Sequence, residues 1–158
     1  MNDHPMRQRL LHLLTHHRWA ALATADASAT PMVSMVGYVM GQNASVIYLH
    51  LSRLAAHTGN LLADGKAALV VSESDIDAAA DPQELTRVSL QGRCVVVTRD
   101  NGEYSTAKAH YLQRLPASER LFDFPDFVMF RLEVESARFV GGFAQARSFS
   151  REELGTLS

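Results

Sequence analysis

Two apolar runs on either side of a short Gly-Gln-Asn turn constrain this fold more than any other sequence feature. The first run, PMVSMVGYVM, ends at Met40, and the second, ASVIYLHL, begins at Ala44. A turn of this kind between two such runs is typical of a β-hairpin. The segment WAALATA at residues 19–25 is interpreted as a strand that precedes the hairpin. The early part of the chain is therefore expected to form an antiparallel sheet.

The rest of the chain alternates irregularly between strand and helix patterns. Helices are expected from Asp3 and Pro5 onward, at 53–64 and at 101–115. Further strands are predicted by the sequences KAALVVSE, TRVSLQGRCVVVT, DFVMFRLEVE and ARFVGGFA, and a short frayed tail by SREEL. Because helices and strands do not alternate one by one, a doubly wound parallel sheet is disfavoured. The order predicts a mainly β, α+β fold, an antiparallel barrel or sheet with peripheral helices.

The bulk properties fit one domain. The chain has 158 residues, of which 47% are hydrophobic, and a net charge of -2. This length suits a single domain over 1–158, with a helix within 1–18 and a tail at 148–158. The charge gives no support for nucleic-acid binding. With neither a signal peptide nor a long apolar run in the sequence, a cytoplasmic protein is expected, with no membrane partner.

The segment YLHLSRLAAHTGN carries the clearest local signal for a bound anion. Ser52 is expected to cap the helix that follows it. Helix N-termini present free N–H groups and favour negative charge, and the Ser52 hydroxyl and Arg53 guanidinium would add donors for a phosphate. From the local sequence alone, a plain helix cap beside a solvent-exposed arginine is the favoured alternative. The inner face of the helix is expected to comprise Leu54, Ala55, Thr58, Leu61 and Leu62, and its other face Arg53, His57, Asn60 and Asp64.

The longest alternating run places polar side chains on one face of a strand. Val88, Leu90 and Cys94 point one way in this pattern. Arg87, Ser89, Gln91 and Arg93 point the other way. Solvent contact alone explains such a polar row, although Ser and Gln can also bond the edge of a flat heteroaromatic ligand. Cys94 is the only cysteine and is expected to be buried, so no disulfide can form within the chain.

Metal sites and common catalytic motifs are not predicted. His12 and His16 stand four residues apart, a spacing compatible with two metal ligands, but no third ligand completes the set. Surface histidines are the favoured interpretation. Asp75, Asp77 and Asp81 form an acidic loop, but the glycine and glutamate that an EF-hand calcium loop needs at fixed positions are missing, so a solvated loop is expected. No nucleophile elbow, GxGxxG or phosphate-binding loop occurs.

Four stretches in order carry a family resemblance: ALATADASATPMVSMVGYV, IYLHLSRLAAHTGNLLADGKAALVVSE, LTRVSLQGRCVVV and DFVMFRLEVESARFVGGFAQA. They cover most of the chain between Trp19 and Ala146. The chain resembles the FMN-binding split β-barrel proteins related to pyridoxamine 5'-phosphate oxidase, and within them the haem-utilisation (HugZ-type) branch. The resemblance implies a homodimer with FMN at the interface between subunits. It also changes the local interpretation of Ser52 and Arg53 to phosphate ligands.

The resemblance implies which residues hold the cofactor. The set comprises Ser34, Met35, Val36, Tyr48, Ser52, Arg53, His57, Asn60, Arg87 and Gln91. Within this set, Ser34 and the backbone beside it would contact the isoalloxazine ring. His57 and Asn60 would reinforce the phosphate site. Arg87 and Gln91 would reach the flavin from the same or the partner subunit.

Departures from the family pattern limit the activity that it implies. Leu54 stands where the oxidase has a lysine, and the oxidase's C-terminal substrate pattern is missing, so oxidation of pyridoxamine phosphate is not expected. The leading hypothesis is an FMN-dependent oxidoreductase of unknown substrate, with no catalytic residue assigned. One alternative is a haem-binding or haem-degrading protein, with an axial histidine such as His57 or one on the N-terminal helix. A second is a non-enzymatic flavin module, and the deazaflavin F420 is a further candidate cofactor.

Overall fold

The structure is a computed structural model that describes residues 4–158. Its helices are α1 (His4–His16), α2 (Ala56–Ala63), α3 (Gly102–Arg114) and α4 (Arg151–Gly155), with 3-10 segments η1 (Pro82–Glu84) and η2 (Pro116–Asp123). Its strands are β1 (Trp19–Ala25), β2 (Pro31–Gly37), β3 (Val39–Met40), β4 (Val46–Ser52), β5 (Lys66–Ser72), β6 (Arg87–Val96), β7 (Phe127–Val140) and β8 (Ala146–Ser150).

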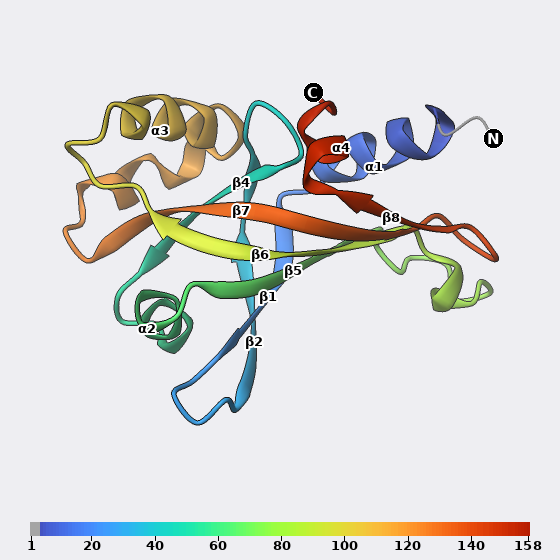
Figure 1. The fold of residues 1–158 in the computed structure, drawn as a ribbon, viewed down its shortest axis with the longest axis horizontal. Coiled ribbons are helices and arrows are strands. Elements are labelled where there is room, and N and C mark those ends of the chain that lie inside the picture. Colours follow the sequence, from blue (N-terminus) through green and yellow to red (C-terminus); the bar gives the residue numbers. More distant parts are fainter. Residues whose placement is uncertain (1–3) are drawn as a thin grey trace.

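All eight strands belong to one sheet, with the order β2-β1-β5-β6-β7-β4-β3 and with β8 beside β7. Every pair along this order is antiparallel, as the sequence predicts. The sheet twists and curls, and α1, α2 and α3 lie around it (Figure 1). Because the sheet curls, residues of β2 and β4 come into contact although the two strands do not pair.

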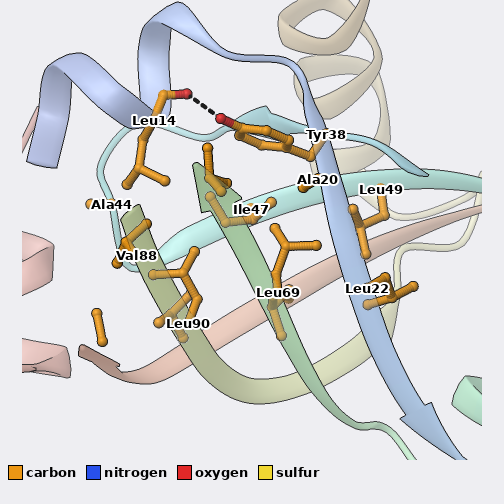
Figure 2. Close-up of a cluster of buried hydrophobic side chains, with 14 of the residues drawn as sticks. Leu14, Ala20, Leu22, Tyr38, Ala44, Ile47, Leu49, Leu69, Val88 and Leu90 are labelled. Atoms are coloured by element: carbon orange, nitrogen blue, oxygen red, sulfur yellow. Dashed lines mark hydrogen bonds between the residues drawn. The ribbon is translucent and has the colours of Figure 1, made fainter. Parts of the chain in front are cut away.

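The main core fills the inside of the curled sheet. Its leucines come from alternate positions on β1, β4, β5 and β6, since successive side chains of a strand face opposite sides. Leu10, Leu13 and Leu14 of α1 cover one end of this core. The Tyr38 hydroxyl donates a hydrogen bond of 2.9 Å to the Leu14 carbonyl, as Figure 2 shows. This bond satisfies the one polar group of a fully buried side chain and fastens α1 to the sheet.

A second core lies outside the sheet, beneath α3 and η2. It comprises Val39, Tyr48, Val97, Ala107, Tyr111, Phe122 and Met129. Ala107 and Tyr111 come from α3, and Phe122 comes from η2. These two helical segments therefore cover the outer surface of β3, β4 and the start of β7.

Several boundaries differ from the sequence prediction. The first apolar run does not pair with the second as one long hairpin, because β2 pairs with β1 and only the two-residue β3 pairs with β4. The two C-terminal strand patterns form the single strand β7. The tail is ordered rather than frayed, since Ser150 and Glu153 form a capping box and Leu154 is fully buried.

The predicted helix cap at Ser52 is also wrong. Helix α2 begins at Ala56, and its N-cap residue is Ala55, which makes no side-chain capping bond. Ser52 instead opens a turn in which the Ala55 amide donates to the Ser52 carbonyl at 3.1 Å. Thr58 and Leu61 form the buried face of α2, whereas the side chain of Leu54 is 89% exposed.

Candidate functional site

The outer surface of β2, β1 and β5 is apolar and uncovered. Val33 and Met35 on β2 are 68% and 49% exposed, and Val70 on β5 is 38% exposed. The strand register aligns Met35 with Ala21 and Ala21 with Val70, so these three side chains form a row across the sheet. A parallel row joins Val33, Ala23 and Ala68. We call these six residues the bare face.

The bare face continues into polar side chains on the neighbouring strands. Val70 pairs with Ser89 of β6, and Ala68 pairs with Gln91. Since α3 and η2 cover the outer surface only over β3, β4 and β7, nothing in residues 4–158 covers the bare face. Contiguous apolar residues on both faces of a strand mark a surface that is buried by a partner or a ligand.

The turn before α2 holds Ser52 against a carboxylate. The Ser52 hydroxyl donates to Asp126 Oδ2 at 2.7 Å, and the Arg53 amide donates to the Asp126 carbonyl, also at 2.7 Å. The Leu54 amide donates to Ser52 Oγ at 3.2 Å. The Arg53 side chain is exposed and its guanidinium has no hydrogen bond or ion pair within residues 4–158. A phosphate at this turn would gain the arginine but would meet the charge of Asp126.

His57 and Asn60 lie one turn apart on α2, which packs against β1 and β2. The Asn60 side-chain amide donates to Thr24 Oγ1 at 3.1 Å and so ties α2 to the end of β1. The His57 side chain is half-buried, and this burial lowers its pKa below the ordinary value. A neutral imidazole keeps a nitrogen lone pair, the form that binds metals.

The three predicted positions on β2 point in different directions. Met35 projects outward as part of the bare face, whereas Val36 is 4% exposed and packs in the main core. Ser34 lies opposite Leu22 on the inner side of the strand and is half-buried. Of these three side chains, only that of Met35 is available to a ligand on the bare face.

Tyr48 lies apart from the α2 group. Its side chain is buried in the second core, and its hydroxyl donates to Glu103 Oε1 at 2.9 Å. Burial, together with the neighbouring Glu103 carboxylate, raises the pKa of Tyr48 to about 12. Tyr48 and Ser52 share one side of β4 four residues apart, which corresponds to about 13 Å along a strand.

Arg87 and Gln91 occupy different places on β6. Arg87 pairs with Ser72 at one end of β5, whereas Lys66, next to the end of α2, pairs with Arg93 at the other. The six-residue separation corresponds to about 20 Å. The Arg87 guanidinium donates to the carbonyls of Gln83 and Leu85 at 2.8 and 3.1 Å. Within one chain, Arg87 therefore does not join the α2 group, whereas Gln91 lies between the two ends, beside the bare face.

The structure adds two features that the sequence analysis missed. Asp126 was missed because it meets Ser52 across 74 residues of chain. The bare face could have been predicted from the sequence of β2, because Val33 and Met35 make this strand apolar on its outer side as well as on its inner side. Such a strand is expected to be covered on both faces.

No helix in residues 4–158 is long and apolar enough to span a membrane. Over the same range, no group of three or more His, Cys, Asp or Glu side chains is gathered so as to hold a metal ion.

Comparison with known proteins identifies the family of this chain. The family model described as CREG, beta-barrel matches residues 8–154. The chloroplastic non-canonical haem oxygenase HOZ of Arabidopsis thaliana is 34% identical over 78% of this chain, which spans 37% of that protein. The haem oxygenase HutZ of Vibrio cholerae is 29% identical over 84% of this chain and 74% of its own length.

Solved structures show the same fold. A haem-binding protein from Mycobacterium smegmatis superposes with a TM-score of 0.83 at 26% identity, covering 94% of this chain and 59% of that one. A putative pyridoxamine 5'-phosphate oxidase from Listeria innocua has a TM-score of 0.65 at 12% identity, over 87% of this chain and 99% of that one. The predicted split β-barrel and its kinship with the haem-utilisation branch are thus confirmed.

Proposed function

Since this chain belongs to the CREG β-barrel family, we propose that it is a haem-binding protein of the haem-degrading kind. The bare face is the observation that carries this proposal. It is an exposed, apolar surface in a chain whose curated relatives are named haem oxygenases. Haem, as ligand and as substrate, would lie against this face, near the end of β1 and β2 where α2 packs.

The chemistry of the bare face fits a porphyrin. Ala21, Ala23 and Ala68 have short side chains, so a planar ring can approach the sheet closely. Val33 and Met35 present larger apolar groups at the outer edge. Burial of apolar area drives binding of such a ring, at about 25 cal/mol per Å² removed from water. Methionine adapts its shape to an aromatic surface and adds favourable sulfur contacts.

A second copy of this chain would cover the remaining exposed apolar surface. A two-fold dimer is built from the same surface on both subunits, and a flat apolar sheet face is self-complementary in this sense. Dimerisation would also bring Arg87 or Gln91 of one subunit toward the α2 end of the other. We therefore expect haem to bind at or beside the dimer interface.

His57 is the residue that we propose as the axial ligand. It is half-buried, this burial lowers its pKa and so favours the neutral ring, and it stands on α2, which packs against β1 and β2. His50 is unsuitable, because its ring is stacked on Phe122 at 3.8 Å and is only 6% exposed. Arg53 lies in the turn before α2, four residues before His57, and its guanidinium, which makes no hydrogen bond or ion pair within residues 4–158, suits a haem propionate.

Each residue has a limited role in this proposal. When bound, haem iron supplies the activation of oxygen that ring oxidation requires. His57 would position the iron, Arg53 would orient a propionate, and the apolar side chains would exclude water from one side of the ring. The chain spans 37% of the plant relative, so the complete reaction and its electron donor are part of the proposal as well.

FMN binding is the second candidate function, and one observation favours it. The free Arg53 guanidinium beside Ser52 supplies a charged fork of donors for a phosphate. The Asp126 carboxylate opposes it, because it occupies the Ser52 hydroxyl. The flavin-module and F420 alternatives depend on the same phosphate site.

Two titrations separate these candidates. Purified protein is titrated with haemin while the Soret band is recorded, and separately with FMN while quenching of flavin fluorescence is recorded. We expect a saturable, shifted Soret band and much weaker FMN binding. Saturable FMN binding without a haem spectrum would replace the haem proposal with the flavin one.

A further inference from the structure

A cleft between α1 and the ends of β5 and β6 collects histidine side chains outside the proposed haem site. Its volume is about 310 Å³, and its walls include His12, His16 and His17 on one side and Glu73 and Thr86 on the other. The two walls come from segments about sixty residues apart in sequence. In Figure 1 the loop between β5 and β6 lies at the same end of the sheet as α1.

The His12 and His16 rings are stacked on one another. Their centroids lie 3.7 Å apart and their planes differ by 28°. Both side chains are exposed, so they can rotate without disturbing the core, which α1 contacts through Leu10, Leu13 and Leu14. Histidines four residues apart on a helix can direct a nitrogen each toward one ion, the spacing that helical zinc motifs use.

The opposite wall supplies negative charge. One oxygen of Glu73 accepts the Thr86 amide at 2.9 Å, and its second oxygen has no hydrogen-bond partner within residues 4–158. Five acidic residues occur between positions 73 and 84, and no lysine or arginine lies between Lys66 and Arg87. This charge raises the local concentration of cations. Arg9 also lines the cleft, and its guanidinium donates to Thr86 Oγ1 at 2.9 Å and to Gln145 Oε1 at 3.0 Å, so the guanidinium is held at the wall opposite the histidines of α1.

We propose that this cleft binds a divalent late first-row transition-metal ion, of the class Zn²⁺, Ni²⁺ and Cu²⁺, through His12 and His16. Imidazole nitrogen is a preferred ligand for these ions. Because no three ligands are gathered within residues 4–158, the site is a two-histidine chelate completed by water. His17 and Glu73 line the same cleft but are not gathered with the pair as ligands. This ion site is separate from the iron of haem and does not depend on the haem proposal.

Calorimetric titration of the 158-residue protein with ZnCl₂ tests the site. We expect saturable binding of one ion per chain. His12→Ala and His16→Ala should each weaken Zn²⁺ binding about tenfold or more. Loss of a residue that only hydrogen-bonds a metal ligand already lowers metal affinity by about 10–100-fold, and loss of the ligand itself should lower it at least as much. His110→Ala, on α3 and outside the cleft, is the matched control and should bind as the wild type does.

Two further measurements make the result specific. The EPR spectrum of the Cu²⁺-loaded protein should show coupling to imidazole nitrogens that both variants reduce. His12→Gln and His16→Gln, with circular dichroism to confirm folding, replace the alanine variants if those misfold. Absence of Zn²⁺ and Cu²⁺ binding, or binding that all variants retain, would overturn the proposal.

Discussion

The hydroxyl of Ser52 donates a hydrogen bond to the carboxylate of Asp126 at 2.7 Å, across 74 residues of chain. This pair joins the end of β4 to the start of β7 beside α2. The hydrogen bond between Ser52 and Asp126 determines which donors a ligand can use at the α2 end of the sheet. A phosphate needs both the Ser52 hydroxyl and the nearby positive charge of Arg53, and Asp126 holds the first. A haem propionate needs only the Arg53 guanidinium, which makes no hydrogen bond within residues 4–158.

Replacing Asp126 with Asn is therefore expected to improve phosphate binding at this turn. The amide keeps a hydrogen bond to Ser52 but removes the negative charge. We expect FMN to bind more tightly to Asp126→Asn than to the wild type, by a factor of about ten, the order of one charge-assisted contact. Fluorescence titration measures this affinity. If the added affinity persists in the Asp126→Asn, Arg53→Ala double variant, the phosphate does not bind at this turn.

The bare face is expected to hold two subunits together. An aspartate at Met35, in the middle of the row with Ala21 and Val70, would be buried without a partner at a dimer interface. We expect Met35→Asp to shift the protein from dimer to monomer in analytical ultracentrifugation. Ile76→Asp is the matched control, because Ile76 is 91% exposed on the loop after β5. Equal masses for both variants and the wild type would exclude the bare face as the interface.

His50 is expected to make the fold sensitive to acid. Its ring is buried against Phe122, and burial with the charges of Arg99 and Lys108 lowers its pKa to about 4. The unfolded chain takes up the proton near pH 6.5, so stability is full above that pH and falls between about 6.5 and 4. The shift corresponds to a loss of about 3 kcal/mol. Urea unfolding measured across this pH range should show that the free energy of unfolding falls less for His50→Leu than for the wild type. If it falls equally for both proteins, His50 is not the source of the acid sensitivity.

Gly92 is expected to be irreplaceable in the bulge of β6. The register shifts between Gln91 and Gly92, and a Cβ at Gly92 would lie 2.0 Å from the Glu133 carbonyl oxygen. We expect Gly92→Ala to destabilise the fold by more than about 2 kcal/mol. Gly59→Ala is the control, since a Cβ there meets nothing within 4 Å and helix α2 should gain about 0.5–1 kcal/mol. Denaturant unfolding gives the free energy of unfolding of both variants. Similar changes in that free energy for Gly92→Ala and Gly59→Ala would contradict the expected steric clash at Gly92.

Local sequence patterns could predict most strands, because alternating burial is encoded residue by residue. The pattern of Val88, Leu90 and Cys94 facing inward is confirmed by their burial. Pairing between segments far apart in the chain could not be predicted from local sequence patterns. Nothing near β4 indicated that it would pair with β7, or that the tail would form a capped helix with Leu154 buried.

The candidate site was predictable only in part, for the same reason. Ser52, Arg53, His57 and Asn60 are near in sequence and remain near one another in the fold. Tyr48 lies apart from these four residues, in the second core, where its hydroxyl bonds Glu103, which is 55 residues later in the chain. The roles of these residues toward a ligand stay predictions.

Haemin titration of the His57→Ala variant tests the central claim most directly. Without the axial imidazole, we expect the shifted Soret band to be lost or strongly weakened, and added imidazole to restore it. His110→Ala, which removes a histidine of α3, should give the wild-type spectrum. A wild-type haem spectrum in His57→Ala, with the same affinity, would contradict the placement of haem at the α2 end of the bare face.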